Sequence, residues 1–344
     1  MNERTKATVW MRAALGVCVW TVLAGVADAE RCTTQSAMTP ADRSALADAA
    51  RSVALKVQAD DTAGLRSTLT PELTRDAAAF EYLAGSTSTK LAGSTAVVEQ
   101  VYLLDASDLK KNADGSPAEA QFFCSLNKTT AEVQFSIPAL PPGRYGFALV
   151  TFASAKPWRL SLLMRQEGGR WLLAGFYPSA MTAAGHDGMW YWTEARQMAK
   201  SKQQWVAWLY YQEAERLLSP AEFVMTTHLD KLRTEAGGAA PSVLSEGIST
   251  DSPLVVKAAD GTEYRFTVLG VDDSLGQASV DVAAHYKADS IADPVAARKR
   301  NDAAAAALVA AYPELRKPFH GVWVFAESAG KPPFATEAPM GEIK

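Results

Sequence analysis

The usual signatures of catalysis are missing from this sequence of 344 residues. It has no HExxH, GxSxG, CxxC, P-loop or GxGxxG motif, so the residue patterns of the common metalloproteases, hydrolases and nucleotide-binding enzymes are absent. Its 4 histidines stand far apart in sequence, and none has a second histidine or a cysteine at i+2 to i+4. The sequence predicts no metal site and no cofactor, and it favours a non-enzymatic protein.

A basic patch is also missing. The formal net charge is −4 at pH 7, and nucleic-acid binding depends on cationic side chains that neutralise phosphates. After the N-terminal region, no apolar run is long enough to cross a bilayer. We therefore expect no nucleic-acid partner and no membrane span in the mature chain.

The N-terminus has the three parts of a secretory signal peptide. Basic residues precede the apolar run Ala13–Val26, and the small residues Ala27 and Ala29 follow it. That order predicts a signal peptide at residues 1–29 that is cleaved after Ala29. The expected location of the mature protein is secreted or periplasmic.

Cysteine is scarce, with 3 in the whole sequence. Cys18 belongs to the expected signal peptide, which leaves Cys32 and Cys124 in the mature chain. Two cysteines in an exported protein suggest a disulfide, because oxidising compartments allow it to persist. The alternative is two unpaired thiols.

Residues 38–180 carry helix signals followed by strand signals. Capping residues such as Thr39-Pro40 and Thr70-Pro71 predict three helices, which end near Ala59, Leu69 and Leu83. Runs rich in β-branched and aromatic residues then predict strands at Val97–Leu104, Gln121–Leu126, Ala131–Ile137, Tyr145–Ala153, Trp158–Arg165 and Trp171–Tyr177. Between the last two, Gly168-Gly169 predicts a tight hairpin turn that needs positive φ values.

Helices followed by an antiparallel sheet, together with the phrase QADDTAGL at residues 58–65, resemble the NTF2-like (cystatin-like cone) superfamily over residues 38–179. The resemblance implies helices packed against a bent sheet. Some members of that superfamily are enzymes with polar residues inside the cone, and many are not enzymes. By position, the residues that could line such a cavity are Tyr82, Glu99, Tyr102 and Asp105. Outward-facing strand positions for the acids, and helix packing for Tyr82, are the alternatives.

Residues 185–236 form an expected helical segment that is unusually aromatic. Residues 188–220 resemble a single tetratricopeptide-like hairpin, and Ser219–Glu222 has the pattern of a capping box that starts a third helix. In His186-Asp187, Asp187 is expected to cap a helix, with a catalytic base as the alternative. The aromatic residues could form a core between domains or a surface that binds a protein or a glycan, and the proposed surface residues are Trp190, Trp192, Trp205, Trp208 and Tyr211.

Residues 243–331 predict a small β-β-β-α-β domain, and residues 332–344 an extended tail. The whole chain is therefore expected to be α+β. Its expected function is an exported, non-enzymatic binding or scaffold protein of the cell envelope, which uses the aromatic surface or the cone to recognise a protein partner or a small ligand. The alternative is a small-molecule lyase or isomerase with its site in the cone.

The predicted disulfide can be tested by intact mass. If Cys32 and Cys124 are bridged, complete reduction of the unfolded chain adds two hydrogens and raises the mass by about 2 Da. An unchanged mass after reduction would contradict the bridge.

Overall fold

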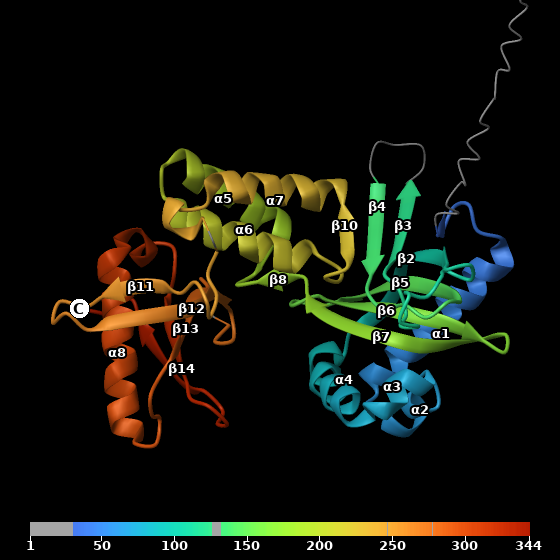
Figure 1. The fold of residues 1–344 in the computed structure, drawn as a ribbon, viewed down its shortest axis with the longest axis horizontal. Coiled ribbons are helices and arrows are strands. Elements are labelled where there is room, and N and C mark those ends of the chain that lie inside the picture. The colour runs from blue at the N-terminus through green and yellow to red at the C-terminus, as the bar shows by residue number, and fades with distance from the viewer. Residues whose placement is uncertain (1–29, 126–131, 246, 277) are drawn as a thin grey trace, which may run out of the picture.

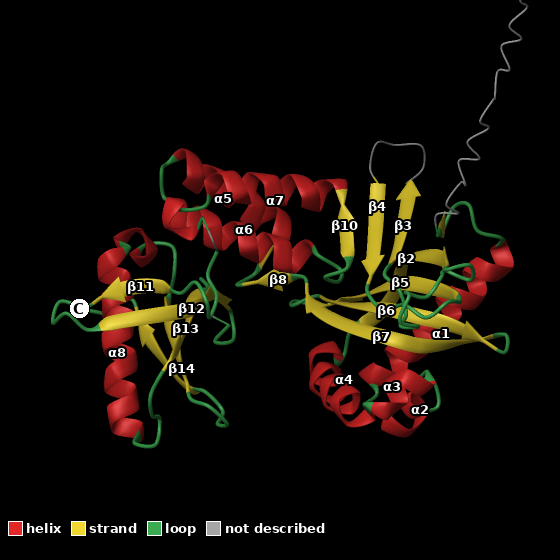
Figure 2. Cartoon of the chain, viewed as in Figure 1, coloured by secondary structure: helices red, strands yellow, loops and turns green. Residues whose placement is uncertain are grey.

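The computed structural model describes residues 30–125, 132–245, 247–276 and 278–344. It is an α+β protein, as the sequence predicts (Figures 1 and 2). The strand orders are β1-β2-β5-β6-β7 in the first sheet, β10-β4-β3 in a small sheet, β11-β12-β13-β14-β15 in the C-terminal sheet, and β8-β9 in a short pair. Within the described residues, no helix is long and apolar enough to cross a membrane.

Four helices cover one face of the first sheet (Figure 1): α1 (Pro40–Gln58), α2 (Thr62–Arg66), α3 (Pro71–Arg75) and α4 (Ala77–Leu91). The predicted third helix is thus two helices, and α4 continues eight residues past Leu83, the expected end. The small polar residues after Leu83 lie within α4, and their hydroxyls donate to carbonyls about one turn earlier; for example, Thr87 donates to the Leu83 carbonyl at 2.7 Å. Leu91 is then fully buried against the sheet.

The first sheet is antiparallel throughout, and its strands are β1 (Arg31–Thr34), β2 (Thr95–Asp105), β5 (Arg144–Ala153), β6 (Trp158–Glu167) and β7 (Arg170–Ala180). The predicted turn between β6 and β7 is confirmed, since Gly168 and Gly169 have φ values of 54° and 79°. Strand β1 was not predicted. The bridge from Cys32 on β1 to Cys124 on β3 is present, and it joins the first sheet to the small sheet.

The small sheet lies on the other face of the first sheet (Figure 1), with strands β3 (Ala120–Ser125), β4 (Glu132–Ile137) and β10 (Val224–Thr226). The predicted strand ends at Leu126 and Ala131 lie outside the described residues. The capping box predicted at Ser219–Glu222 is wrong: a helix ends there, and the chain continues into β10. Val224 pairs with Phe135 and is buried in the core of this sheet, which outweighs the local helix signal.

The helical segment contains α5 (Gly188–Lys200), α6 (Gln204–Leu218) and α7 (Thr227–Ala239), after the short strands β8 (Thr182–Ala183) and β9 (His186–Asp187). The capping prediction for Asp187 is confirmed, because its carboxylate accepts the Trp190 backbone N–H at 2.8 Å. The segment shares one apolar core with the C-terminal domain. In that core Trp205 lies 4.1 Å from the Tyr312 ring, and Tyr210 lies 5.7 Å from the Phe319 ring.

The C-terminal sheet packs against a helix that connects its two parallel strands. Its elements are β11 (Leu254–Lys257), β12 (Glu263–Asp272), β13 (Asp281–Lys287), α8 (Pro294–Ala311), β14 (Gly321–Glu327) and β15 (Phe334–Pro339), with short 3₁₀ turns at Ser242–Leu244 and Pro313–Arg316. The expected extended tail is wrong, because it forms β15 on the sheet edge. The Asn301 side chain on α8 donates to the carbonyls of Val324 and Phe334, and Thr336 is buried.

A buried arginine connects the first sheet to the helical segment. Arg159 on β6 donates to the carbonyls of Leu217, Leu218 and Ser219 at the end of α6. These are carbonyls that no helical N–H can reach, and a cation is favoured at that end of a helix dipole. Burial nevertheless lowers the pKa of Arg159 to about 10. The contact fixes α6 relative to the sheet.

Trp205 provides a test of the shared core. We expect Trp205→Ala to lower the free energy of unfolding by about 3–5 kcal/mol, because it removes a large buried side chain and leaves a cavity. Met189→Ala is the matched control, since Met189 lies on the neighbouring helix and is exposed; its cost should stay within about 0.5 kcal/mol. Denaturant unfolding measures both, and equal effects would contradict the assignment of Trp205 to the core.

Candidate functional site: a cleft between the first sheet and the helices

Two of the four predicted cone residues lie on the outside of the molecule. Tyr82 on α4 is 81% exposed. Glu99 on β2 is exposed, and its carboxylate accepts a hydrogen bond from the Thr151 hydroxyl at 2.8 Å. The core beneath the helices consists of apolar side chains such as Leu46 and Val53 of α1. Neither Tyr82 nor Glu99 is part of that core.

The other two predicted cone residues, Tyr102 and Asp105, also lie outside the apolar core beneath the helices. Tyr102 is buried on the opposite face of the sheet, where its ring packs against Phe135 at 5.3 Å. Asp105 pairs with Arg31 at 3.1 Å. Burial acts to raise the pKa of Asp105, but hydrogen bonds to Ser107 and the charge of Arg31 lower it overall. That direction is opposite to the one expected of a carboxyl base in an enzyme cone, and the four residues do not converge.

The predicted aromatic surface is largely interior. Trp192, Trp205 and Tyr211 are buried, so they cannot form an exposed platform together. Trp190 and Trp208 are partly buried and pack against the same core. The alternative of an interior core therefore describes these residues: Trp205 packs against Tyr312 of the C-terminal domain, and the Trp192 indole donates to Glu235 on α7.

A cleft of about 940 Å³ lies where the first sheet meets the helical segment. Its walls come from α4, from the ends of β4 and β7, from α6 and the segment after it, and from α7. The apolar part of the lining includes Leu83, Ile137, Phe176, Tyr177 and Phe223. The polar part includes Gln212, Glu215, Arg216, Glu222 and Arg233.

The aromatic wall of the cleft is rigid. The rings of Tyr177 and Phe223 meet edge to face at 5.1 Å, and Phe223 meets Phe147 in the same way at 5.7 Å. Such pairs are stabilising beyond the area that they bury. Burial raises the pKa of Tyr177, so its hydroxyl stays neutral at physiological pH. This wall offers apolar contact and one neutral hydroxyl.

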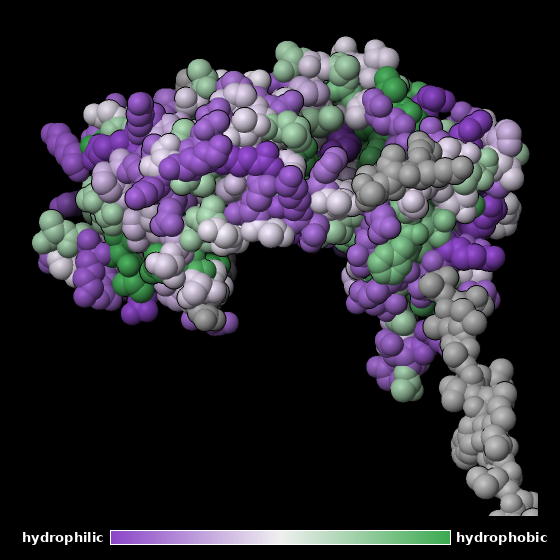
Figure 3. Space-filling model, turned by 90° about the horizontal axis from the view of Figure 1, so that it is seen from above, coloured by the Kyte–Doolittle hydropathy of each residue, from purple (hydrophilic) through white to green (hydrophobic). Residues whose placement is uncertain are grey.

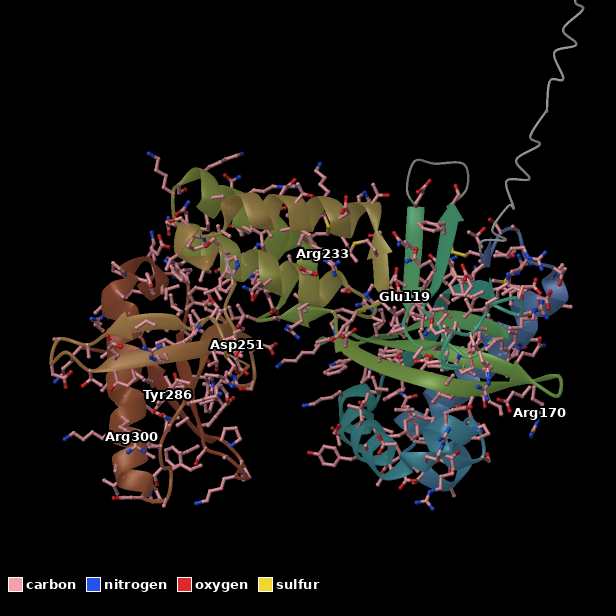
Figure 4. All side chains as sticks on the ribbon, viewed as in Figure 1. Glu119, Arg170, Arg233, Asp251, Tyr286 and Arg300 are labelled. Atoms are coloured by element: carbon pink, nitrogen blue, oxygen red, sulfur yellow. A yellow bond between two sulfur atoms is a disulfide. The ribbon has the colours of Figure 1, made fainter. Side chains whose placement is uncertain are left out.

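The charged wall of the cleft is held in place by ion pairs. Arg216 donates through Nε to the Glu213 carboxylate at 2.8 Å, and Glu213 is buried while about half of the Arg216 side chain remains exposed. Arg233 pairs with Glu215 at 2.5 Å across α7 and α6. Figure 4 shows Arg233 on the helical segment beside β10. A buried partner limits the rotamers of Arg216, which prepares its exposed part for a ligand.

Sequence reasoning missed this cleft for a physical reason. Its lining comes from segments around residues 137, 177, 219 and 233, which only the folded chain brings together. One signal was present in Ser219-Pro220, a chain break after an amphipathic helix, but the sequence interpretation assigned it to a helix start. The strand pairing of β10 with β4 has no local signature.

A second group of polar residues lies at the end of the C-terminal sheet. Asp281, His320 and Glu337 have one potential ligand atom each, and these atoms lie within 4.8 Å of one another. The sequence predicted no metal site, because the three residues are far apart in the chain and Glu337 was assigned to an extended tail. This is the one such group of metal-ligand type among the described residues.

No family model, no curated protein and no solved structure matches this chain. The resemblances to NTF2-like proteins and to a tetratricopeptide hairpin therefore stay predictions from sequence. The signal peptide also stays a prediction, since residues 1–29 lie outside the described part of the chain.

The buried Glu213 gives a pH-dependent prediction. Burial is the main cause that raises its pKa above the ordinary 4.5, and the charges of Asp272 and Asp273 act in the same direction. The folded state therefore holds this proton more tightly than the unfolded state, so stability from Glu213 is fully present below pH 4.5 and is lost as pH rises through the raised pKa. Glu213→Gln, which cannot ionise, should gain stability relative to the parent protein as pH increases.

Denaturant unfolding of both proteins at a series of pH values from acid to neutral checks this expectation. The free energy of unfolding of Glu213→Gln minus that of the parent protein should increase over that pH range and then level off. A difference that is constant, or that changes in favour of the parent, would mean that the ion pair with Arg216 outweighs desolvation.

Proposed function

We propose that this protein is an exported, non-enzymatic binding protein of the cell envelope that holds a small ligand in the cleft between the first sheet and the helices. The observation that carries this proposal is the pairing of a rigid aromatic wall, at Tyr177 and Phe223, with fixed charged groups at Arg216 and Arg233. Concave sites with apolar walls and a few placed polar groups are typical of small-molecule binding.

The chemistry of the lining favours an amphipathic ligand. An apolar or aromatic body would contact the rings of Tyr177, Phe176 and Phe223, and a polar group would face Arg216 and Arg233. Both arginines already pair with carboxylates, so the local charge is close to balanced and a strongly charged ligand gains little. A neutral compound with oxygen acceptors fits best, since Glu222 adds a further carboxylate to the lining and guanidinium groups donate to oxygen acceptors in a fixed geometry.

Export is supported by two independent features. The sequence of residues 1–29 has the order of a cleavable signal peptide. The bridge between Cys32 and Cys124 is of the kind that persists in oxidising compartments. The resemblance of residues 38–179 to NTF2-like proteins agrees with a non-enzymatic role, because many members of that superfamily are not enzymes.

A thermal-shift screen of the mature protein against small amphipathic metabolites tests the proposal. A ligand at about one hundred times its dissociation constant adds ~2.7 kcal/mol to stability, which raises the Tm by a few degrees. For a compound that gives such a shift, Arg233→Ala should weaken binding at least about tenfold, because a hydrogen bond to a charged group is lost. Calorimetric titration measures the affinity.

Arg170→Ala is the matched control for this experiment. Arg170 is an exposed arginine at the far end of the β6–β7 hairpin, away from the helical segment (Figure 4). Its removal should leave the affinity unchanged. Equal losses in the two variants, or binding that is indifferent to Arg233→Ala, would place the ligand outside the cleft.

A further inference from the structure

Three side chains meet at the end of the C-terminal sheet where β13 and β14 begin. Asp281 is the first residue of β13, His320 immediately precedes β14, and Glu337 lies on β15. The Nδ1 atom of His320 lies within hydrogen-bond distance of Asp281 Oδ1, at 3.0 Å, and 3.6 Å from Glu337 Oε1. Ligand atoms around a tetrahedral zinc ion with bonds of about 2.0–2.2 Å lie roughly 3.4 Å apart. The two measured separations bracket that value.

The group has more negative charge than its own members can neutralise. Asp281 is almost completely buried, and the Glu337 side chain is largely buried. A protonated His320 could balance only one of the two carboxylates, and Asp272 and Glu342 add negative charge nearby. Buried carboxylates of this kind are normally paired or bound to metal ions.

One acceptor atom in the group is unsatisfied. Oε1 of Glu337 is buried and accepts no hydrogen bond from any described residue, and its separation of 3.6 Å from His320 Nδ1 is too long for one. Buried polar atoms almost always have a partner, so an orphaned carboxylate oxygen in a native fold requires an explanation. It points toward the same space as the two other ligand atoms.

The backbone is shaped around this group. Gly321 lies directly beneath the carboxylates, and a Cβ atom there would lie 3.1 Å from Asp281 Oδ1, 2.8 Å from the Ala338 carbonyl and closer still to Glu337 Oε1. The neighbouring His320 is fixed from both sides, because its N–H donates to the Val280 carbonyl and its carbonyl accepts the Met340 N–H, each at 2.9 Å. A side chain at position 321 would collide with the Glu337 carboxylate and the Ala338 carbonyl.

We propose that Asp281, His320 and Glu337 form a binding site for one divalent transition-metal ion, of which zinc is the best fit. One imidazole nitrogen and two carboxylate oxygens are ligands that zinc accepts, whereas magnesium and calcium prefer oxygen alone. His320 is partly exposed, so an ion here could be reached from solvent and would keep a fourth position for water or another ligand. The inference does not depend on the cleft.

The test uses mature protein without an affinity tag, stripped of metal with a chelator. Titration with Co²⁺ followed by visible absorption, and with Zn²⁺ by calorimetry, should show roughly one ion per chain with the intense bands of tetrahedral Co²⁺. His320→Gln and Glu337→Gln should each weaken binding at least about tenfold, because each removes or weakens one ligand. Circular dichroism confirms that the variants keep the parent fold.

His285→Gln is the matched control. His285 lies on the same strand as Asp281 and pairs with the Glu327 carboxylate at 2.8 Å, but the described residues place no third metal-ligating group beside it. Binding that survives in this variant and is lost in His320→Gln supports the site. A stoichiometry far below one, equal losses in all variants, or Mg²⁺ and Ca²⁺ that bind as tightly as Zn²⁺ would each overturn it.

Discussion

The buried guanidinium of Arg159 is the contact on which the arrangement of this molecule depends. It extends from β6 to the carbonyl end of α6, and it also donates to the Ser179 hydroxyl at 3.2 Å. Ser179 and Ser219 both line the cleft, so the same side chain holds two of its walls. A buried arginine with no carboxylate partner is costly in isolation. Its hydrogen bonds to four oxygens offset that cost only when the sheet and the helix are in place together.

Two further features connect the parts of the chain. Strand β10 leaves the helical segment to complete the small sheet, and the disulfide joins that sheet to β1. On the other side, α5 and α6 share their apolar core with the C-terminal sheet. The view from above in Figure 3 shows two lobes with mostly polar surfaces joined by one body. The helical segment is therefore a structural bridge that is built into both neighbours.

The sequence predicted what depends on local chemistry. The cap at Thr39, the two glycines of the β6–β7 turn and the Asp187 cap follow from hydrogen bonds within a few residues, and each is present. Features that depend on distant partners were missed. Strand β15 was assigned to a tail, whereas its stabilising contacts come from distant residues such as Asn301 on α8. Strand β10 was missed because it is only three residues long. The cleft and the C-terminal ligand group were missed because they too depend on distant partners.

The negative charge of Asp272 acts both on the charged wall of the cleft and on the proposed metal site. Asp272 pairs with Asp281 across β12 and β13, and its charge also acts on Glu213, the buried partner of Arg216 in the cleft wall. Coulomb interactions between partly buried groups are screened less than those at the surface. A divalent cation at Asp281 would therefore offset the negative charge around Asp272 and reduce the repulsion that Glu213 experiences. In this arrangement α6 is the element through which the C-terminal sheet can influence the charged wall of the cleft.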